Sequence, residues 1–187
     1  MPLALVTPVA EHLPSYVDAL ERGWTPDNTA GGEATRLRFL ERIAEDADAF
    51  LASMDDREAN GPDIVLPDGT AVKRLPGFNR WMWDDGFVGA IGLRWSPGTE
   101  ELPSHVLGHI GYAVVPWARR QGHATAALRA LLPQAAETGL RWIELTTDPE
   151  NLASQKVIIA NGGRLLGRFT KPAAYGGAEG LRWRIDL

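Results

Sequence analysis

The residues with the clearest chemical potential lie in one short turn, Arg119-Arg120-Gln121-Gly122. An apolar run that ends at Pro116 precedes this turn, and a helix-forming run from Ala124 follows it. A strand–turn–helix connection leaves main-chain N–H groups unpaired at the helix start, where the positive end of the helix dipole adds to them. Together with the two arginines these groups can form an anion site, and phosphate suits it best. The alternative is an ordinary connection whose arginines are solvated.

The hydrophobic pattern places this turn inside a chain that mixes strands and helices. We predict helices at Ala10–Arg22, Ala34–Met54, Gly122–Thr138 and Asn151–Ala160. We predict strands at Leu3–Val6, Ile64–Leu66, Asn79–Trp83, Phe87–Trp95, His109–Val115, Trp142–Thr147, Arg164–Phe169 and Leu181–Ile185.

Two connections determine the expected topology. Asp84-Asp85-Gly86 predicts a hairpin, which makes the N-terminal half of the sheet antiparallel. The helix-length crossover between His109–Val115 and Trp142–Thr147 predicts a parallel pair. We therefore expect an α/β (α+β) fold in one domain, residues 1–187. Its sheet is mixed and twisted, with an antiparallel N-terminal half, a central parallel pair and helices on both faces.

Composition and charge narrow the function. The 187 residues carry a net charge of −5 at pH 7, which argues against a nucleic-acid-binding surface because such surfaces are basic. Cysteine is absent, and the four histidines lack the spacing of metal ligands, so neither a thiolate nucleophile nor a metal is expected. No apolar run approaches the roughly 18 residues of a membrane span. No signal peptide is evident either, so a cytoplasmic location without membrane contact is expected.

The turn and its surroundings resemble a known family. Residues 119–124, RRQGHA, fit the signature (Gln/Arg)-x-x-Gly-x-(Gly/Ala) of the GNAT superfamily of acyl-CoA-dependent acyltransferases. The order of elements from Val88 to Phe169 is similar to the central half of that family. The phrases GHIGY and NGG resemble a bacterial subgroup described only as predicted acetyltransferases.

The resemblance implies acetyl-CoA, or another acyl-CoA, as co-substrate. In the family, main-chain amides of the turn hold the pyrophosphate, and the preceding strand bonds the pantetheine as an added strand would. A bulge and splay between the two parallel strands open the wedge for the thioester. The asparagine that opens the later helix contacts the pantetheine arm, and plain N-capping is its alternative role. The implied cofactor-binding residues are Val114, Val115, Arg119, Arg120, Gly122, His123, Ala124, Thr125, Asn151 and Ser154.

Acyl transfer also needs an acid to protonate the departing thiolate. The family often supplies a tyrosine on the helix after the second parallel strand, and this chain has Ile158 at that position. Tyr112 and Tyr175 are the candidate substitutes. Departure of the thiolate without a dedicated acid is the alternative.

A base must remove a proton from the acceptor ammonium. His109 is the candidate because histidine has an unperturbed pKa of about 6.5. Strand alternation puts His109 and Tyr112 on opposite faces, so both can face the cleft only if the strand bulges between them. The alternatives are a structural, hydrogen-bonded histidine, a carboxylate such as Glu100, Glu101 or Glu144, or a chain of water molecules.

The resemblance implies direct transfer to an amine of a small molecule or peptide, within a ternary complex. The absence of cysteine fits direct attack, because no cysteinyl acyl-enzyme can form. In the family the N-terminal helices help form the acceptor cleft, so the loop Trp24–Glu33 is a candidate lid, and homodimers are common.

Two other functions compete with this one. A non-catalytic, CoA-binding regulatory module would have the same fold, and the isoleucine at position 158 favours it. An unrelated nucleotide-phosphate binder could use the same turn, although no Walker or dinucleotide fingerprint is present.

Overall fold

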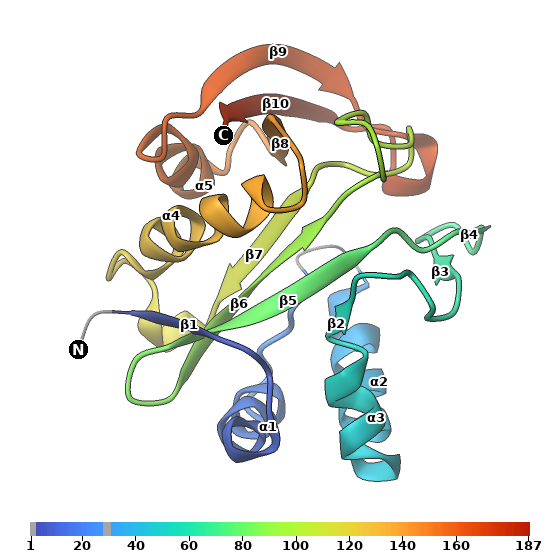
Figure 1. Cartoon of the computed structure of the whole chain (residues 1–187), viewed down its shortest axis with the longest axis vertical. Coiled ribbons are helices and arrows are strands. Elements are labelled where there is room, and N and C mark those ends of the chain that lie inside the picture. Colours follow the sequence, from blue (N-terminus) through green and yellow to red (C-terminus); the bar gives the residue numbers. More distant parts are fainter. Residues whose placement is uncertain (1–2, 28–30) are drawn as a thin grey trace.

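The computed structural model describes residues 3–27 and 31–187. The chain forms two antiparallel sheets, of which the first lies between helices, and a small hairpin extends to one side (Figure 1). This architecture confirms the expected mixed α/β fold with an antiparallel N-terminal half. The candidate lid Trp24–Glu33 is described except for residues 28–30, which lie outside the described part of the chain.

The first sheet comprises β1 (Ala4–Val6), β2 (Asp55–Asp56), β5 (Gly77–Trp83), β6 (Phe87–Arg94) and β7 (Ile110–Val114). Its order is β1-β5-β6-β7, with β2 beside β5, and each of these pairs is antiparallel. The predicted hairpin between β5 and β6 is confirmed. Its turn has φ of 54° at Asp85 and 141° at Gly86, a backbone that suits an Asp-Gly pair.

The second sheet comprises β8 (Trp142–Thr147), β9 (Arg164–Thr170) and β10 (Glu179–Asp186), in the order β8-β10-β9. The last two strands, β9 and β10, pair in antiparallel orientation. The sequence did not indicate that β10 also pairs with β8 and so lies in the middle of this sheet.

The two sheets meet where β7 and β8 begin to separate. The His109 N–H donates to the Glu144 carbonyl at 2.8 Å, whereas the His109 carbonyl accepts from the Arg94 N–H at 2.9 Å. The main chain of His109 thus bonds to a strand on each side. In the described residues no ladder continues between β7 and β8. The expected parallel pair of β7 and β8 is therefore reduced to one main-chain hydrogen bond, after which the two strands diverge.

The N-terminal helices are shorter than expected. The segment predicted as one helix, Ala34–Met54, forms α2 (Gly32–Glu45) and α3 (Ala47–Ala52). Asp46 breaks it because its backbone is extended (φ −157°, ψ 94°) and its side chain accepts from the Ala49 N–H at 2.9 Å. The apolar periodicity continues across this break, so the pattern concealed it. The predicted helix Ala10–Arg22 forms a 3₁₀ turn, η1 (Ala10–His12), and α1 (Leu13–Glu21).

The C-terminal helices lie close to their predicted positions. They are α4 (His123–Ala136) and α5 (Leu152–Ile159), with 3₁₀ turns η2 (Pro116–Ala118) and η3 (Ala173–Tyr175). Pro133 lies inside α4, which ends within one turn of it. No helix in residues 3–27 and 31–187 is long and apolar enough to cross a membrane.

The first sheet has a core on each face. Tyr16 of α1 stacks on Trp81 of β5, with ring centroids 4.4 Å apart, and Trp24 and Phe87 pack edge-on nearby. Helix α4 covers the other face with fully buried side chains such as Leu128 and Leu131. These aromatic side chains are core residues and do not line an open pocket.

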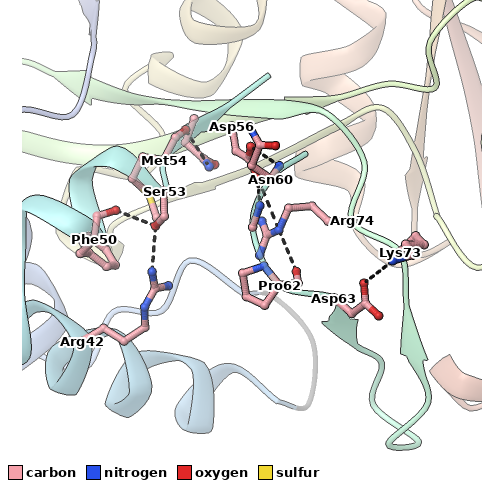
Figure 2. Close-up of polar contacts among 12 residues, drawn as sticks. Arg42, Phe50, Ser53, Met54, Asp56, Asn60, Pro62, Asp63, Lys73 and Arg74 are labelled. Carbon is pink, nitrogen blue, oxygen red and sulfur yellow. Dashed lines mark hydrogen bonds and ion pairs between the residues drawn. The ribbon is translucent and has the colours of Figure 1, made fainter. Parts of the chain in front are cut away.

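A hairpin of β3 (Ile64–Val65) and β4 (Ala71–Val72) extends from the first sheet (Figure 1). Figure 2 shows the contacts of Asp56 at the base of this hairpin. The Asp56 carboxylate accepts from the Asn60 N–H at 2.8 Å and lies 3.7 Å from Arg74. Arg74 also donates to the Pro62 carbonyl at 3.0 Å. The turn Pro67-Asp68-Gly69 forms the tip. The hairpin is therefore held at its base while its tip projects.

Candidate active site

The turn after β7 presents unpaired main-chain donors. Arg120 and Gly122 both have left-handed backbones, with φ of 65° and 85°, and Gly122 is the N-cap of α4 without a side-chain cap. The N–H groups of residues 120–125 donate to no acceptor in the described part of the chain. A side chain at Gly122 would meet no protein atom within 4 Å, so the space in front of these donors is open. The predicted anion site thus has the required local geometry.

The side chains of the turn have different surroundings. Arg119 is exposed, and its Nε donates to the Val114 carbonyl at 3.2 Å, while Arg120 is exposed at the left-handed position. The His123 side chain is buried and points toward Asp84, with 3.9 Å between Nε2 and Oδ2. Of His123, only the main-chain N–H therefore faces the anion site.

The splayed edge of β7 presents further main-chain groups. Val115 donates to the Val88 carbonyl at 3.0 Å and accepts from the Ala118 N–H at 3.0 Å. Val115 was expected to bind the cofactor through its main chain, but both of its main-chain groups already form hydrogen bonds within the protein. Alternation along β7 turns the N–H groups of Val114 and Tyr112 away from β6 and toward the gap. These two residues fit a pantetheine-like chain.

His109 is fully buried at the junction of the two sheets. Its Nδ1 accepts from the Glu144 N–H at 2.9 Å, and its ring packs edge-on against Trp142. Burial lowers the pKa of His109, against a smaller opposite effect of Glu144, so the imidazole is neutral near pH 7. Because its side chain has no exposed surface, this geometry favours the structural alternative over the catalytic one.

Tyr112 points from β7 toward α5. Its hydroxyl lies 3.4 Å from the Ser154 carbonyl, in the first turn of that helix. Burial raises the pKa of Tyr112, so the hydroxyl keeps its proton at neutral pH. Asn151 caps α5 by accepting from the Ser154 N–H at 3.1 Å, as its alternative role predicted. The first turn of α5 therefore meets β7 at the gap through Tyr112.

Ile158 cannot take the place of the family's tyrosine. Its side chain is buried, and a Cβ built on Gly163 would lie 2.2 Å from Ile158 Cγ2. The side chain therefore packs under the end of α5 and not toward the gap.

The carboxylates considered as bases are held in ion pairs. Glu100 bonds Arg141 Nε at 2.6 Å, and this contact lowers the pKa of Glu100 to about 2. Glu144 bonds Arg184 at 2.7 Å and lies 3.6 Å from Arg182, in a polar recess of about 380 Å³ beside β8. Neither carboxylate is placed to accept a proton at the gap.

Tyr175 lies on η3, between the last two strands. It is half-buried, and burial raises the pKa of its hydroxyl while the positive charge of Arg94 lowers it. Arg94 Nη2 would lie 3.2 Å from a Cβ built on Gly111 of β7. The structure thus places Tyr175 near an arginine at the end of β6 and not beside Tyr112.

Comparison with known proteins identifies the family. The family model described as "Acetyltransferase (GNAT) domain" matches residues 8–164. The chain belongs to the GNAT acetyltransferase family. No curated protein matches the sequence.

Solved GNAT structures share the fold at low identity. RimJ of Mycobacterium smegmatis, in complex with a CoA-disulfide, is 19% identical with a TM-score of 0.65, over 99% of this chain and 82% of that one. RimL, the ribosomal L7/L12 alpha-N-protein acetyltransferase, in complex with CoA, is 13% identical with a TM-score of 0.65, over 100% and 95%. The ribosomal-protein-S5-alanine acetyltransferase of Vibrio fischeri is 15% identical with a TM-score of 0.60, over 100% and 93%.

In this GNAT domain, sequence reasoning located the anion turn and named Tyr175, but it missed Arg94 and Gly111. Arg94 and Gly111 are adjacent only because β6 and β7 pair, and Tyr175 joins them from the C-terminal sheet. An arginine that ends a strand is an ordinary sequence feature. Only the pairing register, which puts Gly92 opposite Gly111, could have indicated that neither strand carries a side chain at this place.

Proposed function

We propose that the protein is an N-acetyltransferase that uses acetyl-CoA and acetylates an amine by direct attack in a ternary complex. The observation that carries this proposal is the run of unpaired N–H donors at residues 120–125, at the start of α4. The open edge of β7 beside it supports the same reading, because a pantetheine arm can bond there as an added strand.

Different residues would bind different parts of acetyl-CoA. The main chain of Gly122, His123, Ala124 and Thr125 would hold the pyrophosphate, and Arg120 would add a charge-assisted bond. The N–H groups of Val114 and Tyr112 would bond the pantetheine arm. Asn151 keeps a side-chain nitrogen that has no acceptor in the described part of the chain, and it would contact the same arm.

Tyr112 is the proposed proton donor to the departing thiolate. Bound acetyl-CoA supplies a thioester whose sulfur must leave with a proton. Tyr112 lies at the gap beside α5 and remains protonated at neutral pH, because burial raises the pKa of its hydroxyl. We assign it the acid role that the family gives to the position of Ile158.

The test is acetyl-CoA binding by calorimetry, with two matched variants. Gly122→Trp would cover the unpaired donors and strain the left-handed backbone, so affinity should fall more than about 100-fold, to below detection. Gly139→Trp is the control: Gly139 has φ of 89° and open space as well, but it lies beyond the other end of α4.

Both variants should lose similar stability, and only Gly122→Trp should lose binding. Equal binding by the two folded variants would place the site elsewhere. A folded wild-type protein that binds no acyl-CoA would overturn the proposed function.

A further inference from the structure

Arg94, the last residue of β6, is a charged side chain that has no counter-ion in the described part of the chain. The Arg94 guanidinium forms no ion pair and donates no hydrogen bond within residues 3–27 and 31–187. Its side chain remains accessible to solvent, yet desolvation lowers its pKa. A missing hydrogen-bond partner is more costly for such a partly desolvated group than for a fully hydrated one.

The sheet surface beside Arg94 is formed by glycine. Gly92 and Gly111 face each other across β6 and β7, and Asn79 covers Gly92, because its Oδ1 would lie 2.6 Å from a Cβ built there. Gly111 is exposed, and Arg94 Nη2 lies over it. The guanidinium therefore stands beside open β7 main chain, next to Tyr112.

Three other segments carry groups that interact electrostatically with Arg94 or Tyr175. Tyr175 of η3 lies close enough to Arg94 for each to affect the pKa of the other. Asp27, which accepts from the Thr35 hydroxyl at 3.2 Å before α2, raises the pKa of Tyr175 by its charge. Asp68 does the same from the tip of the β3–β4 hairpin, whose base Asp56 ties (Figure 2). These four residues, called the Arg94 cluster below, thus combine one cation (Arg94) and a protonated hydroxyl (Tyr175) with two carboxylates (Asp27 and Asp68).

We propose that Arg94 binds a carboxylate of the acceptor, so that the preferred acceptor is an amine carrying a carboxylate a few bonds from its nitrogen. This inference rests on the proposed acetyltransferase function. The planar guanidinium matches a carboxylate in a two-bond geometry, and the Tyr175 hydroxyl can add a third donor. Two nearby negative charges, Asp27 and Asp68, disfavour a dianion such as phosphate.

Position along β7 sets the expected spacing. The proposed pantetheine path follows the strand from Val114 toward Tyr112, and Gly111 is the next residue. Neighbouring residues in a strand are about 3.3 Å apart, so an anion held over Gly111 lies one or two residue lengths from the reacting end. This spacing suits the α-carboxylate of an amino acid or the side chain of an acidic N-terminal residue.

Paired acceptors test the proposal and separate these two sources. Transfer from acetyl-CoA is measured on phenylalanine against phenylalanine amide, and on the amidated peptide Glu-Ala-Ala against Gln-Ala-Ala. In wild type at least one carboxylate member should have a kcat/KM about 10- to 100-fold above that of its neutral partner, mainly through KM. The first pair reports an amino-acid acceptor and the second an acidic N-terminus.

Three variants test whether Arg94 causes the preference for the carboxylate acceptor. Arg94→Gln should remove the preference, and Arg94→Lys should retain part of it, because an ammonium keeps the charge and loses the two-bond geometry. Arg164→Gln, which removes an exposed charge on the edge strand β9, should change nothing. All three should bind acetyl-CoA as wild type does. Equal rates on both members of each pair, or a preference that survives Arg94→Gln, would overturn the proposal and leave the acetyltransferase function standing.

A second measurement covers the case in which no acceptor of this panel reacts. Saturation-transfer NMR would then compare N-acetylphenylalanine with its amide, and N-acetylglutamate with N-acetylglutamine, in the presence of CoA. Binding of a carboxylate member that Arg94→Gln abolishes would support the proposal even without turnover. Binding that does not depend on Arg94, or no binding at all, would overturn it. Failure to bind acetyl-CoA, in contrast, would count against the proposed function alone.

Discussion

The two ends of the candidate site are built in different ways. The anion turn at residues 119–125 is made of consecutive main-chain groups, and its geometry depends on the left-handed backbones of Arg120 and Gly122. The Arg94 cluster consists of side chains from β6, η3, the segment before α2 and the β3–β4 hairpin, which interact electrostatically. In the proposed assignment, the first region binds the phosphates of the cofactor, whereas the second selects among acceptors.

This difference predicts that variants will affect the two ends separately. Changes in the turn should alter the affinity for acetyl-CoA alone, and changes in the Arg94 cluster should alter the acceptor KM alone. Tyr112 and His109 lie between the two regions, on β7 or just before it. Variants of Tyr112 should therefore test the chemical step, and variants of His109 should test the stability of the sheet junction.

The largest effect is expected at Tyr112. Tyr112→Phe removes the proposed proton donor and should lower kcat by about 100-fold, with little change in either KM. Tyr175→Phe is the matched control, because the same hydroxyl is lost on the acceptor side; it should raise the acceptor KM and leave kcat nearly unchanged. Steady-state kinetics with both substrates varied measures this. A loss of kcat in Tyr175→Phe and none in Tyr112→Phe would reverse the two assignments.

The next effect is on stability, at the junction of the two sheets. His109→Leu leaves the Glu144 N–H without its acceptor and should lower the free energy of unfolding by about 1 to 3 kcal/mol. His109→Asn places an oxygen near the position of Nδ1 and should lose less. Denaturant unfolding at pH 7.5 measures both. An Asn variant that is as unstable as the Leu variant would show that the hydrogen bond is not what matters.

The same histidine predicts a pH dependence. Because burial lowers the pKa of His109, the unfolded chain binds this proton more readily than the folded one. Its contribution to stability is therefore full above about pH 6.5 and is lost as the pH falls toward the lowered folded value, by up to about 1.4 kcal/mol per pH unit. The Asn variant should lack this component of the acid sensitivity, and an identical pH profile in wild type and variant would contradict it.

The smallest effects should come from adding one methyl group to either end. Gly122→Ala places a side chain on a left-handed backbone and should weaken acetyl-CoA binding several-fold at a cost of about 1 kcal/mol of stability. Gly111→Ala would press on the mobile end of Arg94, 3.2 Å away, and should raise the acceptor KM a few-fold. Acetyl-CoA calorimetry and acceptor kinetics on both variants test the separation. Two variants with the same pattern of effects would show that the two ends are not independent.

Local features of the chain were predictable from the sequence alone. The turn before α4, the Asp85-Gly86 hairpin and the Asn151 cap all depend on residues within a few positions of one another, so residue type and spacing suffice to predict them. The GNAT resemblance carried by residues 119–124 was confirmed by the family match. The break at Asp46 is also local, but the uninterrupted apolar periodicity hid it.

Only the tertiary structure decided which groups are paired and which are free. Val115 loses its expected role because Val88 and Ala118 take its main-chain bonds, and His109 is buried because Glu144 lies across the junction. Arg94 becomes a binding candidate because β7 places a glycine under it. A sequence names each donor and acceptor, but strand register and burial determine whether a partner from a distant segment reaches it.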